Sequence, residues 1–83
     1  MLFPKSLRLQ WSDSWPERAG DFTGRDPGNK DLTARVFSVH HGPYPATWFW
    51  TVADGRELGS GYSADRNAAA GMAEKAYFSR HKS

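Results

Sequence analysis

Two stretches in the middle of the chain, residues 34–40 and 47–53, have the pattern of β-strands. The second stretch carries almost only aromatic and β-branched side chains, a composition typical of a half-buried or fully buried strand. Because successive side chains of a strand point to opposite faces, Trp48 and Trp50 share one face and Phe49 lies on the other. The pattern therefore predicts two neighbouring strands with bulky indoles on one side.

Two turns separate these strands from each other and from the C-terminal part of the chain. The segment from Gly42 to Pro45 contains two prolines, which cannot donate a hydrogen bond to a strand ladder and so favour a turn. Asp54-Gly55 is a strong hairpin pattern, because glycine tolerates the positive φ that tight hairpin turns need. With a short strand after this turn, at 57–62, the segments form an antiparallel meander.

The last part of the chain predicts a helix that begins near Ser63 and ends near Phe78. Ser63 is expected to cap its first turn, and Asp65 is well placed for the helix dipole. A stripe of mostly small side chains recurs at helical spacing: Ala68, Ala69, Met72, Ala73 and Ala76. Small side chains on a helix fit large ones on a sheet, so Trp48 and Trp50 are predicted to pack against this stripe.

The first third of the chain is less regular. Leu7, Leu9 and Trp11 alternate with polar residues, which predicts one more strand at an edge of the meander. Residues 12–32 show no period and are predicted to form a long irregular loop, which is either pinned to the sheet by an aromatic side chain or serves as a partner-binding arm. The whole chain, 1–83, is therefore predicted to be one α+β domain: an antiparallel sheet of three to four strands, in strand–strand–strand–strand–helix order, with one C-terminal helix on one face and a core at 33–78.

Composition narrows the class of protein. The chain has 83 residues, enough for one domain, and no cysteine, which excludes disulfides and thiolate zinc sites. Eleven basic and nine acidic side chains give a net charge of +2, without the clustered basic face expected of an electrostatic nucleic-acid binder. We see no secretory leader and no run of about 20 apolar residues, so we expect a cytoplasmic protein that does not enter membranes.

No arrangement of residues carries catalytic or metal chemistry. The adjacent His40 and His41 would point to opposite faces of a strand, so they cannot bind one metal ion. Ser60 stands between two glycines but lacks the Gly-x-Ser-x-Gly frame of a hydrolase elbow. We therefore expect no enzymatic activity, no catalytic residue, no metal and no cofactor.

Surplus aromatic side chains are the most informative feature for function, because one helix cannot cover all of them. Either the first strand, the long segment or a second subunit covers the remainder, or they form a binding surface, since Trp and Tyr dominate interface energetics. A homodimer through the open face of the sheet would satisfy both explanations. The predicted partner-binding residues are Trp15, Tyr44, Phe49 and Tyr62.

Residues 33–77 resemble the second half of a double-stranded-RNA-binding domain. Gly42-Pro43 stands at that family's Gly-Pro turn, Gly59 and Gly61 at its spaced glycines, Ser63 at the serine that opens its helix, and Ala69 to Ala76 within the helix. The resemblance implies the strand–strand–strand–helix topology.

The residues with which that family binds RNA do not transfer. Its two phosphate-binding lysines fall at Ala64 and Asp65, its turn histidine falls at Pro45, and its leading helix is replaced by the predicted strand and loop. Nucleic-acid binding, to duplex RNA or to DNA, is nevertheless our alternative function. It would use Arg56, Arg66, Arg80 and Lys82.

The small size and aromatic-rich architecture are also similar to the orphan proteins of phages and prophages, among them anti-CRISPR proteins. That resemblance implies stoichiometric binding to a host defence complex, and the net charge of +2 argues against a DNA mimic, which needs a strongly acidic face. We therefore predict a non-enzymatic module that acts by protein–protein interaction, in the manner of a mobile-element inhibitor of a host complex.

Overall fold

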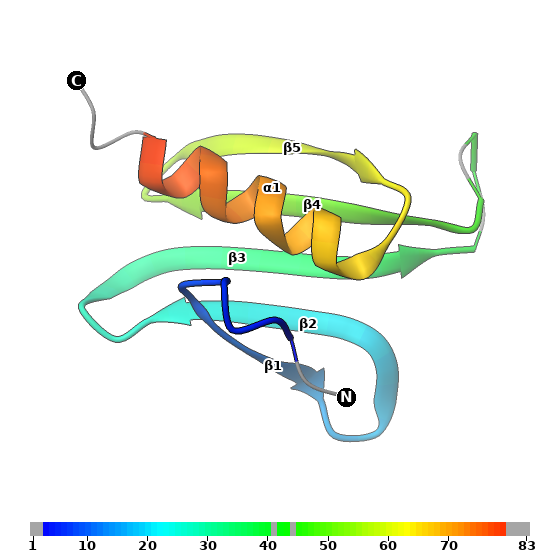
Figure 1. Cartoon of the computed structure of the whole chain (residues 1–83), viewed down its shortest axis with the longest axis horizontal. Coiled ribbons are helices and arrows are strands. Elements are labelled where there is room, and N and C mark those ends of the chain that lie inside the picture. Colours follow the sequence, from blue (N-terminus) through cyan, green and yellow to red (C-terminus); the bar gives the residue numbers. More distant parts are fainter. Residues whose placement is uncertain (1–2, 41, 44, 80–83) are drawn as a thin grey trace.

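The protein is described by a computed structural model that covers residues 3–40, 42–43 and 45–79. The elements are, in chain order, β1 (Gln10–Trp15), β2 (Arg18–Asp26), β3 (Asn29–Val39), β4 (Thr47–Asp54), β5 (Glu57–Ser63) and α1 (Arg66–Ser79). The five strands form one antiparallel sheet in which each strand lies beside the next (Figure 1). The predicted α+β class with one C-terminal helix is confirmed, and the predicted three to four strands are in fact five.

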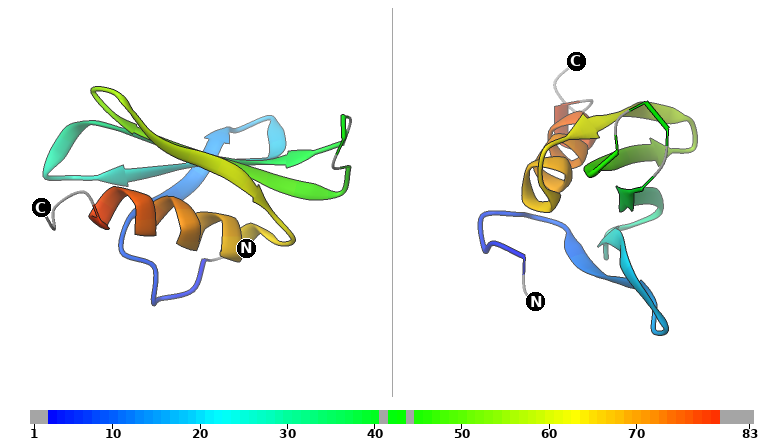
Figure 2. Two further views of the ribbon diagram at one scale, coloured as in Figure 1. Left: turned by 90° about the horizontal axis from the view of Figure 1, so that it is seen from above. Right: turned by 90° about the vertical axis from the view of Figure 1, so that its right-hand side faces the viewer.

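One face of the sheet is covered by two segments from opposite ends of the chain. α1 packs on β3, β4 and β5. The N-terminal segment, residues 3–9, lies on the same side of the sheet, beside the helix (Figure 2). The other face, which we call the open face, has no covering element among the described residues.

The centre of the core is the fit of an indole between sheet and helix. Trp50 stands opposite Gly61 in the register of β4 and β5, and its ring lies over Gly59 and Gly61. A Cβ atom on Gly61 would come within 3.0 Å of the Trp50 Nε1 atom. Trp50 shares one buried cluster with Ala69 and Ala73 of the helix. The predicted packing of a bulky indole against small helical side chains is therefore confirmed for Trp50, and Trp48 packs at the edge of this cluster.

The buried stripe of α1 is rotated relative to the prediction. Its buried residues are Arg66, Ala69, Ala70, Ala73, Glu74 and Tyr77, whereas Ala68 and Met72 are exposed. The alanine pattern alone leaves the orientation of the helix open, and long polar side chains decide it: Glu74 faces the N-terminal segment and Tyr77 reaches the β2–β3 turn. Within the described residues there is no helix with the length and apolar character needed to cross a bilayer.

The cap of α1 also differs from the prediction. Oδ1 of Asp65 accepts a hydrogen bond from the backbone N–H of Ala68 at 2.8 Å, the geometry of an N-cap. Ser63 is instead the last residue of β5. The position at which the resemblance expects a lysine, Asp65, therefore serves the helix itself.

The predicted loop at 12–32 is wrong, because this segment contains most of β1, all of β2 and the beginning of β3. Glycines in this segment favour a loop when the sequence is considered alone. In the structure Gly24 belongs to β2 and leaves room for an indole, because a Cβ atom there would lie 2.9 Å from the ring of Trp11. The predicted edge strand over Leu7, Leu9 and Trp11 is found, but it begins later, so that it includes Trp11 and leaves Leu7 and Leu9 outside. The part that contains Leu7 and Leu9 is irregular, and β1 begins at Gln10.

Candidate binding surface

The open face carries a row of three aromatic side chains across β3, β4 and β5. The register places Phe37 opposite Phe49 and Phe49 opposite Tyr62. Their ring centroids are 5.3 Å and 5.1 Å apart, so the rings touch in tilted and edge-to-face arrangements. Tyr62, on the edge strand, is 47% exposed. We call these three residues the aromatic row.

A fixed arginine stands at the β3 end of the aromatic row. The guanidinium of Arg35 lies 4.9 Å from the ring centroid of Phe37. Its Nε and Nη2 atoms donate to the two oxygens of Asp21, which is buried and also accepts from the Ser14 hydroxyl at 2.7 Å. The side-chain hydrogen bonding that Arg35 donates to Asp21, opposed by desolvation and supported by the charge of Asp21, raises the pKa of Arg35 above its ordinary value. Arg35 is therefore charged at every physiological pH and held in one place on the open face.

The predicted partner-binding residues divide into three groups. Phe49 and Tyr62 come together in the aromatic row. Trp15 is 49% exposed, but it ends β1, at the opposite edge of the sheet from β5. Tyr44 lies outside the described residues. Of the three described residues, only Phe49 and Tyr62 are neighbours, so these three do not form one surface.

The prediction missed Phe37, Arg35 and Asp21. Phe37 follows the alternation of its own strand, but only the register of β3 against β4 shows that it shares a face with Phe49. Asp21 lies in the segment that was expected to be an irregular loop, so its contacts could not be predicted from the sequence. Arg35 and Asp21 are brought together by the β2–β3 pairing, in which Asp21 stands opposite Phe37.

Two of the predicted nucleic-acid-binding residues, Arg56 and Arg66, are described by the structure, and they lie beyond opposite ends of β5. Arg66 is only 8% exposed, and its guanidinium lies over the rings of Phe3 and Phe22, at 4.0 Å and 5.3 Å from their centroids. It therefore holds the N-terminal segment in place and is not available to a nucleic acid, which corrects the prediction. Arg56 is exposed in the β4–β5 turn, and Arg80 and Lys82 lie outside the described residues.

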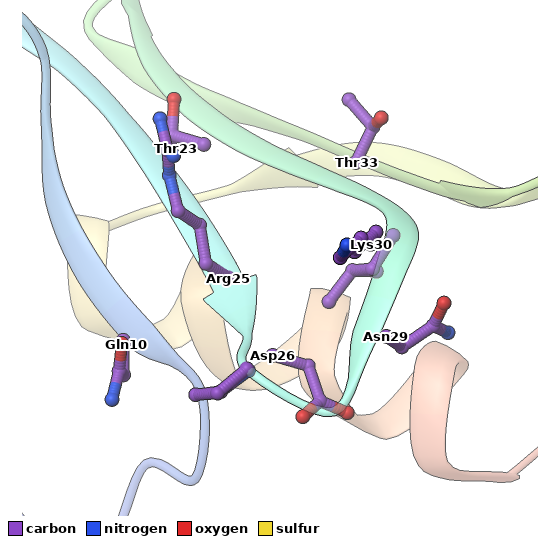
Figure 3. Close-up of a pocket in the computed structure, with 9 residues that line it drawn as sticks. Gln10, Thr23, Arg25, Asp26, Asn29, Lys30 and Thr33 are labelled. Atoms are coloured by element: carbon purple, nitrogen blue, oxygen red, sulfur yellow. The ribbon is translucent and has the colours of Figure 1, made fainter.

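A second feature, which the sequence did not indicate, is a hollow at the β2–β3 hairpin (Figure 3). Gly24 pairs with Ala34, but the next pair along is Asp26 with Asn29, so residues 30–33 of β3 face Arg25 alone. The strands separate there around a cavity of about 490 Å³. Arg25 and Lys30 line it from the two strands, with Thr23, Thr33, Gln10 and Asp26 among the other lining residues.

Comparison of the chain with protein-family models, with curated proteins and with solved structures finds no match in any of the three. The resemblances to double-stranded-RNA-binding domains and to small phage proteins therefore stay predictions. Within the described part of the chain, no group of three or more His, Asp or Glu side chains is placed to hold one metal ion. The candidate surface must be judged on its own geometry.

Proposed function

We propose that this chain is a non-catalytic binding module that attaches to another protein through the open face of its sheet. The observation that carries the proposal is the aromatic row, which runs uncovered across three strands to the half-exposed Tyr62. Tyr and Arg are enriched among the residues that dominate binding energy at protein interfaces, and Arg35 stands beside the row in a fixed position. The narrower form, an inhibitor of a host complex in the manner of small phage proteins, rests on the resemblance alone.

The charge around the aromatic row favours a protein over a nucleic acid as the partner. The positive charge of Arg35 is compensated by Asp21 in a bidentate pair. Phosphate backbones are recognised chiefly by uncompensated Lys and Arg side chains, whereas the centres of protein interfaces are depleted of net charge. An aromatic row with a neutralised arginine therefore suits the centre of a protein–protein contact.

The proposal is tested by affinity capture from cells of the source organism, with the chain and its variants as baits and with nuclease treatment of the extract. Phe49→Ala and Tyr62→Ala are the test variants, and Met72→Ala is the matched control because Met72 is similarly exposed but lies on the helix. We expect one or more proteins that the unaltered chain and Met72→Ala retain and that both test variants lose. Circular dichroism must show that the test variants remain folded. Equal recovery by all baits would overturn the proposal.

Nucleic-acid binding is the second candidate, and one observation favours it. Exposed aromatic side chains on an open sheet face are the platform on which several protein families stack single-stranded bases. Fluorescence titration with single-stranded and duplex RNA and DNA, at two salt concentrations, separates the candidates. Binding that weakens steeply with salt and depends on Phe49 and Tyr62 would replace the protein proposal. A second copy of this chain is the third possible partner for the open face. Sedimentation of the chain alone at several concentrations shows whether it self-associates.

A further inference from the structure

The hollow at the β2–β3 hairpin lies between two paired positions, Gly24 with Ala34 and Asp26 with Asn29, because β3 has more residues than β2 between these pairs. One residue of β2, Arg25, faces residues 30–33 of β3. Extra residues in one strand of a pair disrupt the ladder locally and turn side chains in new directions. Figure 3 shows the result from the open side of the sheet, with the helix behind it: Arg25 and Lys30 project from the two separated strands, and Asp26 and Asn29 lie at the turn.

The lining of the hollow combines apolar and polar groups and carries two cations: Pro27 and Leu32 contribute apolar surface, and the cations are Arg25 and Lys30. Arg25 and Lys30 are both exposed, and neither makes an ion pair within the described part of the chain. The side chains of Thr23, Thr33 and Gln10 line the same cavity, and the Thr23 hydroxyl also shares a hydrogen bond of 2.7 Å with the Ser14 hydroxyl. Cationic and neutral polar groups from three strands therefore face one hollow that is open to solvent.

Among the described residues, one carboxylate lines the hollow, that of Asp26, and it accepts hydrogen bonds from the protein itself. Oδ2 of Asp26 accepts from the Tyr77 hydroxyl at 2.7 Å, and Oδ1 accepts from the backbone N–H of Gly28 at 3.0 Å. The Asn29 amide donates to the same Tyr77 hydroxyl at 3.1 Å. These bonds tie the hairpin turn to α1, so the base of the hollow is rigid. With one carboxylate against two cations, the lining keeps a net positive charge.

We propose that this hollow binds a small phosphate-bearing ligand, whose phosphate is held by Arg25 and Lys30 and whose hydroxyl groups contact Thr23 and Thr33. Its volume of about 490 Å³ lies within the range of small-molecule sites and exceeds what a single phosphate ion fills. Among the described residues, no aromatic side chain lines it, so a nucleobase would find only the Arg25 guanidinium to stack on. The chemical class that fits is a sugar phosphate. None of these residues belongs to the aromatic row, so the inference does not rest on the proposed function.

The test is a titration of the ¹⁵N-labelled chain, followed by amide chemical shifts at constant ionic strength. Ribose 5-phosphate is the probe, with ribose and inorganic phosphate as separate arms. We expect saturable shifts in the amides of residues 23–33 with ribose 5-phosphate, weaker binding of inorganic phosphate at the same place, and no response to ribose. Arg25→Gln and Lys30→Gln should each weaken binding about ten- to hundredfold, the value of one charge-assisted hydrogen bond.

Arg56→Gln is the matched control, because Arg56 is an exposed arginine in the turn of the other hairpin and does not line the hollow. It should leave the affinity unchanged. Shifts of similar size around Arg56 and Lys75 would show diffuse attraction to basic side chains and overturn the proposal. Unchanged affinity in both Arg25→Gln and Lys30→Gln would do the same, provided that their amide spectra retain the dispersion of the unaltered chain. Because the aromatic row is intact in these variants, either failure leaves the protein-binding proposal standing.

Discussion

The sheet has two halves, which are covered on the same side by different kinds of contact. We call β3, β4 and β5 with their cover the apolar half, and β1 and β2 with their cover the polar half. Over β3, β4 and β5 the cover is α1, and the contact is an apolar fit of Trp50 between glycines of β5 and alanines of the helix. Over β1 and β2 the cover is the N-terminal segment, which packs through Phe3 and Leu9 and is held in addition by charged side chains of the helix. The comparison shows that one helix stabilises one half by shape and the other by directed polar contacts.

Glu74 is the centre of the polar half. It is 6% exposed, and its carboxylate accepts from the backbone N–H groups of Arg8 and Leu9, the first at 2.7 Å, the second at 2.8 Å, and from Nε1 of Trp11 at 2.9 Å. A buried carboxylate with several donors is strongly anchored, since its removal leaves each of those donors without an acceptor. The irregular N-terminal segment therefore needs no strand ladder to stay on the sheet.

The largest effect is expected in the apolar half, from Trp50→Ala. Truncation of a buried tryptophan costs about 3–5 kcal/mol, and a domain of this size has a free energy of unfolding of about 4–12 kcal/mol. We expect the free energy of unfolding to fall by about 3–5 kcal/mol, a quarter or more of the total, as measured by urea denaturation followed by circular dichroism. Trp15→Ala is the control, because Trp15 is 49% exposed and should change stability by less than about 0.5 kcal/mol. A Trp50→Ala variant that keeps the stability of the unaltered chain would mean that the apolar fit is not what holds this half together.

The second largest effect is expected in the polar half, from Glu74→Gln. The amide has nearly the same shape, but its –NH₂ group must face donors that the carboxylate now satisfies, at a cost of about 2–3 kcal/mol. Hydrogen exchange should show the loss first at the amides of Arg8 and Leu9, while β4 and β5 keep their protection. Glu17→Gln, an exposed carboxylate, serves as the control. Uniform loss of protection over all five strands would contradict the division into two halves.

The apolar half could be predicted from the sequence because its information is local. Between residues 47 and 76 the chain contains an aromatic run, an Asp-Gly turn and an alanine-rich segment, one after another. Each of the three predicts its own element, a strand, a hairpin turn and a helix. The polar half could not, because its main contact joins residues 66 positions apart, Arg8 and Glu74. A single glutamate in a helical segment has no pattern that distinguishes a buried anchor from a solvated side chain.

The candidate surface divides in the same way. Phe49 and Tyr62 were predicted because they belong to a strongly patterned pair of strands, and the surplus of aromatics was visible in the composition. Arg35 and Asp21 were not, because their meeting depends on the register of β2 against β3, in a hairpin whose polar and glycine-rich sequence resembles a loop. The hollow was missed for the same reason, since an offset in strand pairing has no mark in the sequence.

The two halves can be compared directly by adding one methyl group beneath each indole. Gly61→Ala would place a Cβ 3.0 Å from Nε1 of Trp50, and Gly24→Ala would place one 2.9 Å from the ring of Trp11. Overpacking costs about 1–3 kcal/mol. We expect Gly61→Ala at the upper end of that range, because Trp50 is buried, and Gly24→Ala at the lower end, because the half-buried Trp11 is able to move.

A double-mutant cycle with Glu74→Gln gives that comparison a sharper form. Gly24→Ala and Glu74→Gln both loosen Trp11. The double variant should therefore lose less free energy of unfolding, measured in urea, than the sum of the losses in the two single variants. Gly61→Ala and Glu74→Gln have no shared partner and should be additive within about 0.5 kcal/mol. Coupling of the same size in both cycles would show that the two halves act as one packed unit.

The smallest effect, and the only stabilising one, is expected at the boundary between the two halves, from Gly71→Ala. Gly71 lies in the middle of α1, and a Cβ there would meet no atom within 4 Å, so close approach of the backbone does not explain this glycine. Alanine is favoured over glycine in a helix by about 0.5–1 kcal/mol, partly because it restricts the unfolded chain, and urea denaturation should show a gain of that size. Met72 is the next residue and is also exposed, but Met72→Ala replaces no glycine. It should therefore change the free energy of unfolding much less. A loss of stability in Gly71→Ala would mean that the N-terminal segment packs against α1 more closely at this point than the open space beside Gly71 indicates, and that the polar half also depends on fit.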